Sequence, residues 1–418
     1  MGIDYIPQII TFIFLLVVIS YYILFLIRVR KPKITEKFSS ISVIVPTHNE
    51  ERYIKDCLSS IINADFDGKK EIIVVDDGSV DNTVKIVSKN FPNVKIIQKK
   101  HTGKSDSINT AISKSKGQVI AIVDGDSYIQ KDSLKYVTEE ISRKNVVAAS
   151  GVIKVRNRKK ILGMWLHIEQ IYNSLIRLVF SKVNANVVTP GPLSVYRKKA
   201  LKEVGGFSVK GFSEDVDVTI ILIRAGHKIG FSSKAVSETN MPLEPKWFWL
   251  QRTRFARGLI DILKKHLMLN KTWIDIYTLP LLLFNYIQAI IMGSFTIYQI
   301  VSGYITYFYA KGIIFNLATL KFFFEWFSIV GFFRWSVQAF TGQIPLNFIT
   351  IIGIVSTFLT YPLYLYAILK FDKKITIWHI IPLFFMFPFW FLIMIIYIVC
   401  IPEYFRKDQH NIWKKYDP

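Results

Sequence analysis

Two carboxylates one residue apart follow an apolar, strand-like run in the first half of the chain. Asp124 and Asp126 flank Gly125 directly after Val119–Val123. At the end of a strand such a pair can reach one hard cation and a nucleotide together, because Mg²⁺ prefers oxygen ligands and keeps diphosphate oxygens and waters in its shell. A turn of Asp and Gly is also a common strand ending, so the pair alone is a weak signal.

Five further polar clusters occur along the chain, and four of them fall where loops are expected. They are Pro46–Glu50, Val74–Ser79, His101–Lys104, Glu214–Asp215 and Gln251–Phe255. An aspartate at a strand end can accept hydrogen bonds from the base or ribose of a nucleoside, and a lysine can bind phosphate oxygens. The clusters together indicate a nucleotide-binding site.

Short β-branched runs alternate with helical stretches around these clusters. The expected strands are Ile41–Pro46, Glu71–Asp76, Val94–Gln98 and Val119–Asp124, and the expected helices between them are Glu51–Asn63, Asp81–Ser88 and Ser105–Ser115. Strands and helices in this alternation predict a parallel, doubly wound α/β sheet. Ligands bind such sheets at the carboxyl ends of the strands, which is where the acidic clusters stand.

The composition adds a membrane part to this α/β domain. The chain has 418 residues, 51% of them hydrophobic, and a formal net charge of +22. Long uncharged runs lie at both ends, and most of the Lys and Arg residues lie between Arg28 and Lys271. Disorder, collagen-like repeats and a small disulfide scaffold are therefore excluded. Two distant cysteines, Cys57 and Cys400, predict no disulfide, which suits a reducing compartment.

The basic residues are scattered over expected helix faces, and no zinc-finger or RNA-binding signature occurs, so we expect no nucleic-acid partner. The positive-inside rule is the simplest explanation of the charge, and it places the domain in the cytoplasm. Ile6–Ile27 is apolar and long enough to span a bilayer, and the basic segment Arg28–Lys31 follows it. It lacks the early basic region and cleavage site of a signal peptide.

Four more spans are expected, near Ile276–Tyr298, Ile313–Phe333, Leu346–Leu369 and Ile375–Ile401. Five crossings give an external N-terminus and a cytoplasmic tail. Lys370, Lys373 and Lys374 then fall outside, against the charge rule. Arg334–Pro345 is polar enough to be re-entrant or interfacial, which would change the count.

Two stretches near the end of the α/β domain are amphipathic, Ile161–Phe180 and Leu259–Leu269. Such helices can lie at a membrane surface, although ordinary surface helices have the same pattern. The expected organisation is a membrane helix over residues 1–30, a catalytic domain over 31–258, an interfacial helix over 259–275, a bundle of about four spans over 276–402 and a cytoplasmic tail over 403–418.

These clusters, in this order between membrane segments, resemble the family 2 glycosyltransferases, and among them the membrane-integrated processive synthases of hyaluronan, chitin, cellulose and poly-N-acetylglucosamine. The resemblance covers nearly the whole chain. It implies a GT-A domain with a parallel-rich sheet, joined to a helical transmembrane bundle in the cell membrane. It also implies a UDP-sugar donor and either Mg²⁺ or Mn²⁺, since oxygen ligands suit both metals.

The resemblance assigns roles to individual residues by position. A donor-binding group contains Thr47, Glu50, Asp77, Lys104, Asp124, Gln251, Arg252 and Arg254. Asp124 and Asp126 match the metal-binding pair, and Asp215, beside Glu214, matches the general base. The acceptor side would contain Gly191, Pro192 and Phe255.

Two residues depart from the family pattern. Ser213 stands where the motif has Thr, and Phe255 stands where it has the Trp on which an acceptor sugar stacks. Phenylalanine keeps an aromatic face but loses area and the indole N–H. This substitution leaves the acceptor and the processivity open, with Trp247 and Trp249 nearby as other stacking residues.

The implied reaction is inverting transfer of a sugar from a UDP-sugar, most of all UDP-N-acetylglucosamine, to a growing polysaccharide. Asp215 would remove the proton of the acceptor hydroxyl as that hydroxyl attacks the anomeric carbon. An alternative role for Asp215 is to cap the helix Val216–Arg224. Polar residues in or beside the spans would line a polymer channel or join helices to one another.

Two other functions fit the same sequence. One is a non-processive transferase that adds a single sugar to a lipid acceptor. The other is a non-enzymatic membrane scaffold with a degenerate transferase domain, which the intact carboxylates disfavour. The partners expected from this reading are a UDP-sugar, a glycan or lipid acceptor, and the lipid bilayer.

Overall fold

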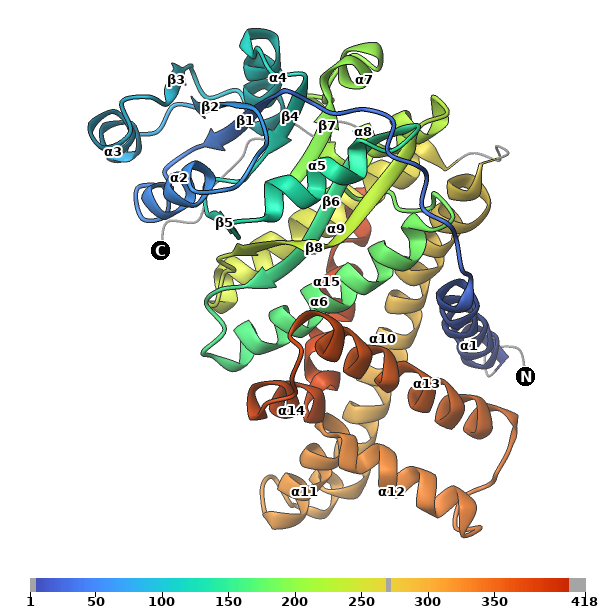
Figure 1. Ribbon diagram of the computed structural model, residues 1–418. Coiled ribbons are helices and arrows are strands. Elements are labelled where there is room, and N and C mark those ends of the chain that lie inside the picture. The colour runs from blue at the N-terminus through green and yellow to red at the C-terminus, as the bar shows by residue number, and fades with distance from the viewer. Residues whose placement is uncertain (1–4, 268–271, 406–418) are drawn as a thin grey trace.

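A computed structural model describes residues 5–267 and 272–405 (Figure 1). Its strands are β1 Ser40–Thr47, β2 Lys69–Asp76, β3 Lys95–Gln98, β4 Val119–Ile122, β5 Ser127–Ile129, β6 Val146–Val155, β7 Ser194–Arg197 and β8 Lys228–Thr239. The helices of the α/β domain are α2 Ile54–Ile62, α3 Thr83–Asn90, α4 Lys104–Lys114, α5 Ser133–Ile141, α6 Ile161–Ser181, α7 Lys198–Glu203, α8 Glu214–Arg224 and α9 Pro245–His266.

The remaining helices form the apolar part of the molecule. They are α1 Tyr5–Leu26, α10 Leu279–Tyr307, α11 Leu317–Phe327, α12 Ile329–Phe340, α13 Phe348–Phe371, α14 Ile377–Phe384 and α15 Met386–Val399. Short helical turns are Ile274–Thr278 (η1), Tyr309–Lys311 (η2) and Ile401–Phe405 (η3).

One sheet organises the α/β domain, with the strand order β3-β2-β1-β4-β7-β6-β8-β5. The four strands expected from the sequence pair in parallel, which confirms the predicted doubly wound half. The other half is mixed, because β7 runs antiparallel to both β4 and β6 and β5 runs antiparallel to β8. The result is a mixed sheet rather than an all-parallel one.

The register brings the carboxyl ends of the parallel strands together. Thr47 pairs with Asp76, and Asp76 pairs with Gln98 on the next strand. On the other side of β1, the amide of Val123 donates to the carbonyl of Ile44, so the segment that leads to Asp124 stays beside β1. The polar clusters that follow the strands therefore meet at one edge of the sheet.

Helix α6 lies between the sheet and the apolar helices. It packs on β6 and β8 on one side and on α13 and α14 on the other (Figure 1). Three charged or titratable residues of α6 are buried between the sheet and the apolar helices, namely His167, Glu169 and Arg177. The amphipathic stretch Ile161–Phe180 is thus a helix covered on both faces.

The second amphipathic stretch belongs to a longer helix than expected. Helix α9 begins at Pro245, a residue favoured in the first helical turn, and ends with Lys264, Lys265 and His266, whose cationic groups favour a helix C-terminus. It therefore includes the whole Gln251–Phe255 cluster. The expected boundary between residues 258 and 259 falls inside this helix, so the structure differs there from the expected organisation.

Within the described residues, three helical segments are long and apolar enough to cross a membrane, and a bent pair would make four. The segments are Tyr5–Leu26, Ile274–Lys311 and Thr350–Phe371. The expected span Ile313–Phe333 differs, because its helix stops at Phe327 and a new one begins at Ile329, after the extended residue Ser328. Asn316 caps the first of these short helices through the amide of Thr319.

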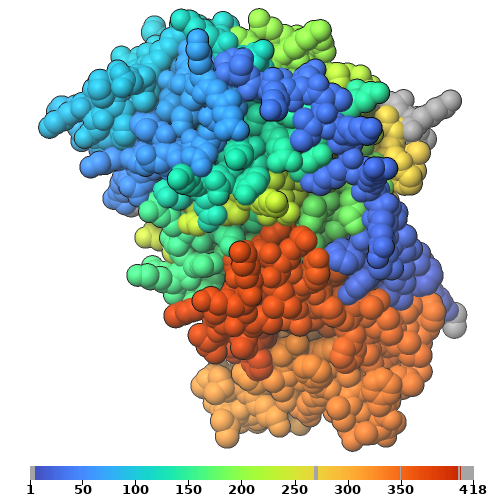
Figure 2. All heavy atoms as spheres, in the orientation of Figure 1, coloured from blue at the N-terminus to red at the C-terminus, as the bar shows by residue number. Residues whose placement is uncertain are grey.

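The last expected span is also broken. Helices α14 and α15 meet at a bend of 55°. Helix α14 packs against α6, whereas η3, after α15, packs against α9. Both ends of this segment therefore lie against the catalytic domain, and on the face seen in Figure 2 the orange and red C-terminal part lies directly beneath the green part of that domain.

The loop between α13 and α14 corrects a prediction about sidedness. Asp372 in this loop is ion-paired with Lys154 of β6 at 2.7 Å. The neighbouring Lys370, Lys373 and Lys374 were expected on the face opposite the catalytic domain, but this contact places their loop on the same face. The expected crossing Ile313–Phe333, which precedes these lysines, is broken at Ser328, and the described residues contain three segments able to cross a membrane, or four with the bent pair, where five were expected. The expected tail, residues 403–418, lies mostly outside the described residues.

Candidate active site

Gly125 packs closely against the loop that follows β1. A Cβ atom at Gly125 would come within 2.9 Å of Cγ of Glu50 and 3.2 Å of Cγ2 of Thr47. Thr47 has no exposed surface, and its hydroxyl donates to the carbonyl of Val75 at 3.3 Å. Thr47 and Glu50 therefore support the turn that carries the two carboxylates predicted to bind the metal.

Asp77 organises the loop before α4. Its buried carboxylate accepts hydrogen bonds from the amides of Thr102 (3.0 Å) and Gly103 (2.9 Å) and from Lys99 Nζ (3.0 Å). Burial alone would raise the pKa of Asp77, but these donors outweigh it and hold the pKa below its usual value. The carboxylate predicted to bind uridine thus holds the loop that leads to Lys104.

Asp76 belongs to the Val74–Ser79 cluster but was assigned no role of its own. One of its two carboxylate oxygens accepts no hydrogen bond from the described residues. Only 4% of the residue is exposed. Its Oδ2 accepts the amide of Ser79 at 3.2 Å, while its buried Oδ1 has no hydrogen-bond partner among the described residues. A buried acceptor without a donor is costly, which favours a donor group supplied by a ligand. Its position at the end of β2 was the available signal.

Lys104 is the first residue of α4 and the cation of the site. Its Nζ lies 2.6 Å from Oδ1 of Asp124 and 3.7 Å from Oε1 of Glu214. Burial opposes the charge, yet the two carboxylates raise the pKa of Lys104 above its usual value. A permanently charged lysine at a helix N-terminus is a suitable site for phosphate oxygens.

The Asp124–Asp126 turn gathers negative charge. Oδ1 of Asp126 accepts the hydroxyl of Ser127 at 3.1 Å and that of Thr239 at 3.4 Å. Burial raises the pKa of the nearby Cys57 thiol, and the charges of Asp126, Glu50 and Asp124 raise it further. This concentration of carboxylate oxygens is a donor set that fits a hard divalent cation.

Gly191 lies directly on Asp124. A Cβ atom there would fall 2.2 Å from Oδ2 of Asp124, so no other residue fits without a rearrangement. The carbonyl of Gly191 also accepts the Asp124 amide at 3.1 Å. The loop predicted to face the acceptor, which continues into Pro192, is therefore placed against a donor-side carboxylate.

Asp215 is the second residue of α8 and is half-buried. Burial and the charge of Glu214 raise its pKa to about 7, while the charge of Lys104 opposes the rise. Ser213 occupies the N-cap position, and the Asp215 carboxylate accepts the amide of its own neighbour Val216 at 2.9 Å. The arrangement suits a base that works near neutral pH better than a helix cap.

The Gln251–Phe255 cluster divides between buried and exposed side chains. Gln251 is 8% exposed, and its Oε1 has no partner among the described residues. Phe255 is 43% exposed, and the guanidinium of Arg254 lies 5.5 Å from its ring centroid. Arg252, which was predicted to contact the donor, is buried, and both of its terminal nitrogens donate to Glu169 of α6, while its Nε has no partner among the described residues.

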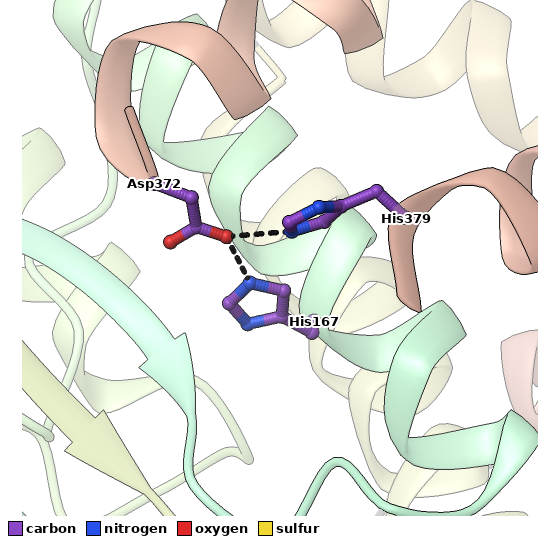
Figure 3. Close-up of side chains that lie close together, drawn as sticks. All are labelled: His167, Asp372 and His379. Carbon is purple, nitrogen blue, oxygen red and sulfur yellow. Dashed lines mark hydrogen bonds and ion pairs between the residues drawn. The ribbon is translucent and has the colours of Figure 1, made fainter. Parts of the chain in front are cut away.

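A second polar cluster joins α6 to the loop after α13 (Figure 3). Oδ2 of Asp372 lies 2.7 Å from Nε2 of His167 and 2.9 Å from Nε2 of His379. Oδ1 of the same carboxylate pairs with Lys154, which also donates to the carbonyl of Phe371 at 2.7 Å. Sequence reasoning did not find this cluster, because its members are far apart along the chain.

Two histidines and an aspartate are common metal ligands, but the hydrogen bonds here argue against a cation. The backbone amide of Thr376 donates to Nδ1 of His379 at 3.0 Å, and that of Val155 donates to Nδ1 of His167 at 3.3 Å. A neutral imidazole whose Nδ1 accepts carries its proton on Nε2. Nε2 of His379 therefore donates to Asp372, whereas Nε2 of His167 lies 2.7 Å from both Oδ2 of Asp372 and Nη1 of Arg158. Protein groups thus contact all four ring nitrogens, and the cluster is a hydrogen-bonded junction between the catalytic domain and the bundle.

Known proteins resemble this chain in sequence. Residues 42–205 match Glycosyl transferase family 2. The poly-beta-1,6-N-acetyl-D-glucosamine synthase of Staphylococcus epidermidis is 28% identical over 304 residues, which cover 71% of this chain and 72% of that protein. The probable glycosyltransferase YdaM of Bacillus subtilis is 30% identical over 237 residues, or 53% of this chain and 56% of YdaM.

Among solved structures, the mannosyltransferase PcManGT from Pyrobaculum calidifontis, in complex with GDP-Man and Mn²⁺, superposes with a TM-score of 0.58. It is 19% identical and covers 88% of this chain and 100% of its own, which is a likeness of fold. The predicted GT-A domain with apolar helices is confirmed. The chain contains a glycosyl transferase family 2 domain, and the protein is a glycosyltransferase.

Proposed function

We propose that the protein is an inverting, metal-dependent synthase that transfers N-acetylglucosamine from UDP-N-acetylglucosamine to a growing polysaccharide. The staphylococcal relative, a poly-beta-1,6-N-acetyl-D-glucosamine synthase that aligns with most of this chain, supports the choice of sugar. The observation that carries the proposal is the meeting of Lys104 with Asp124 at 2.6 Å and with Glu214, the neighbour of Asp215, at 3.7 Å. A phosphate-binding cation and a candidate base thus share one site.

On the donor side, Lys104 and the N-terminus of α4 would bind the diphosphate. The spare oxygen of Asp76 is the acceptor for an N–H or O–H of the nucleoside. Asp124 and Asp126 would hold Mg²⁺ or Mn²⁺, and the Mn²⁺ of the archaeal neighbour supports a divalent ion. When bound, such an ion offsets negative charge on the departing diphosphate.

On the acceptor side, Asp215 takes the proton of the attacking hydroxyl. Its pKa of about 7 leaves it about half ionised at pH 7 and mostly ionised above it, and basic enough to accept a proton. Attack from the face opposite the diphosphate gives inversion in one displacement. Lys104 remains charged and stabilises the leaving group, an electrostatic role that often contributes most to catalysis.

The membrane part would receive the acceptor. Phe255, half exposed on α9, offers a face to a sugar ring, and α9 packs against α10 and α15. Arg28–Lys31 and the lysines beside Asp372 lie on the side of the catalytic domain, which supports a cytoplasmic orientation. Export through the bundle would use its polar residues, except that Glu325 and Arg334 are paired with each other and Asn316 is a helix cap.

The test is a transferase assay on the purified full chain in nanodiscs with Mn²⁺ or Mg²⁺ and a panel of radiolabelled UDP-sugars. Both UDP release and product size are measured. A long labelled product from UDP-N-acetylglucosamine alone supports the proposal. A single sugar on lipid would replace it with the non-processive transferase, which the loss of the motif tryptophan at Phe255 favours. Incorporation from another donor alone would overturn the sugar assignment.

A further inference from the structure

A buried ion pair joins α6 to α9 beside the transferase motif. Glu169 of α6 is 5% exposed and Arg252 of α9 is 8% exposed. Nη1 of Arg252 donates to Oε1 of Glu169 at 2.7 Å, and Nη2 donates to Oε2 at 2.5 Å. This two-point arrangement fixes direction as well as distance, because both groups are planar.

Aromatic rings surround the guanidinium. Its carbon lies 5.3 Å from the ring centroid of Phe248, 5.6 Å from that of Phe255 and 5.7 Å from that of Phe389. The first two rings belong to α9, and Phe389 belongs to α15. The pair therefore lies where α6, α9 and the membrane bundle meet, in surroundings that strengthen its attraction by excluding water.

The pair affects the transferase motif because Arg252 lies within the Gln251–Phe255 cluster of α9. Gln251 precedes it, and Arg254 and Phe255 follow within one helical turn. Since a helix is rigid over one turn, fixing the guanidinium against α6 also fixes the rotation of α9 and the direction of these neighbouring side chains. Losing the pair would let the motif rotate or slide without removing any of its side chains.

We propose that Glu169 is a positioning residue for sugar transfer, acting through Arg252 to hold α9 in register with the catalytic centre. The inference rests on the proposed transferase function. It differs from the role expected from the sequence, in which Arg252 contacts the donor. In the structure Glu169 accepts two of the five N–H donors of Arg252 and fixes the plane of its guanidinium, while Nε has no partner among the described residues.

The two roles predict different kinetics for Glu169→Gln. If Glu169 positions α9, kcat falls about 100-fold, the penalty expected for a displacement of about 1 Å, while the Kd for UDP and the donor KM stay within about threefold. If Arg252 binds the donor, freeing it from Glu169 leaves kcat unchanged and lowers the Kd for UDP. Glu139→Gln, which breaks the exposed 3.0 Å pair with Arg143, is the matched control and keeps wild-type kinetics.

A double variant distinguishes an effect on the position of α9 from an effect on folding. Glu169→Gln leaves a buried guanidinium without its counter-ion, whereas Glu169→Met with Arg252→Met replaces both charges by apolar side chains of similar length and is expected to fold as stably as the wild type. The proposal predicts that this double variant unfolds at the wild-type temperature and binds UDP normally, with kcat still reduced about 100-fold. Arg252→Lys, which cannot make two parallel bonds, should recover only part of kcat.

The wild type serves as the reference for both claims. If the wild type transfers no sugar from any donor, the proposed function fails, and that result is distinct from failure of the inference. If the wild type is active and the folded double variant keeps the wild-type kcat, Glu169 has no positioning role. A raised Kd for UDP in Arg252→Lys, with Glu169→Gln unaffected, would return Arg252 to the donor site.

Discussion

The two halves of the catalytic domain are built differently around their polar groups. On the donor side, Asp76 ends β2, Lys104 begins α4 and Asp124 follows β4, so each lies at the end of an element in the alternating parallel half. On the membrane side, the contacts join distant segments, as in Glu169 with Arg252 and Lys154 with Asp372. Sequence motifs therefore predict the side chains that we propose to bind the donor. The side chains that hold the membrane helices against the catalytic domain belong to no motif.

The motif residues also differ in role, because some are proposed to contact the substrate and others to hold neighbouring groups in position. Asp77 and Arg252 are both charged members of motifs, and both are held by protein groups, Asp77 by the amide of Gly103 and Arg252 by Glu169. Lys104 lies 3.7 Å from Glu214, and its charge opposes the rise in the pKa of the adjoining Asp215. We therefore propose that the motif residues, which look alike in the sequence, fall into two functional classes.

The largest effect is expected on the donor side, from Asp124→Asn. This change removes a metal ligand and the closest carboxylate of Lys104, so transfer should fall by roughly 10³-fold, as for loss of a major electrostatic contact. Chelation of divalent ions should stop wild-type transfer, and added Mn²⁺ or Mg²⁺ should restore it. Radiolabel incorporation measures both. Transfer that persists in excess chelator would remove the metal from the account.

The pH dependence of transfer should show whether Asp215 is the general base. Because the pKa of Asp215 is raised to about 7, its ionised fraction falls as pH decreases below that value. We expect kcat/KM for UDP release to fall about tenfold per pH unit below pH 7, as a single essential base requires. Asp77 stays ionised over the range, because its pKa is lowered. A flat profile from pH 5.5 to 8 would contradict the assignment.

Phe255 tests the acceptor side of α9. Because the ring is 43% exposed, Phe255→Ala should cost little stability. It should lower acceptor use roughly tenfold, the loss of about 1–1.5 kcal/mol of stacking, without changing the donor KM. Phe255→Trp, which introduces the tryptophan of the family motif, should give a product at least as long as that of the wild type. Product-size analysis of both variants measures this, and equal product lengths in all three proteins would exclude stacking on this ring.

The smallest effect on activity is expected at the junction on the membrane side. Asp372→Asn removes the charge that accepts bonds from His167, His379 and Lys154, so the protein should lose about 2 kcal/mol of stability while kcat changes less than about threefold. Thermal unfolding in nanodiscs measures the loss. Asp56→Asn, which breaks an exposed pair with Arg156, is the control and should leave unfolding unchanged.

The pH range of that junction follows from its charge. Hydrogen bonds and nearby cations hold the pKa of Asp372 well below its usual value despite burial. Its stabilising effect is therefore complete at neutral pH and is lost only as pH falls through the acid range below its usual pKa. Wild type and Asp372→Asn should differ in unfolding temperature at pH 7. Equal unfolding temperatures there would show that the junction contributes no stability.

The predictable part of the fold is the part specified by local pattern. Ile41–Pro46 and Val119–Asp124 became neighbouring strands, because β-branched runs that alternate with helices form parallel sheets. The strands β7 and β8 carry no such alternation, and their antiparallel pairing depends on the tertiary fold. The bend between α14 and α15 was hidden within a continuous apolar run, because hydropathy records length but not direction.

The candidate site was predictable to a similar depth. The position of Lys104 beside Asp124 follows from the alternation of strands and helices, since α4 and β4 are consecutive elements of the chain and both lie against β1. The engagement of Arg252 by Glu169 did not follow, because 83 residues separate the partners. Burial also gives Asp215 a pKa that its position in a motif does not reveal.

The central claim is that Asp215 is the base of a transferase whose donor is bound by other residues. The most direct test compares Asp215→Asn with the wild type in nanodiscs, with UDP-N-acetylglucosamine and Mn²⁺, by radiolabel incorporation and equilibrium UDP binding. The account predicts a loss of incorporation of at least roughly 10²–10⁴-fold, the usual contribution of a general base, with the Kd for UDP within about threefold of the wild type. Incorporation at the wild-type rate in a folded, UDP-binding variant would contradict it.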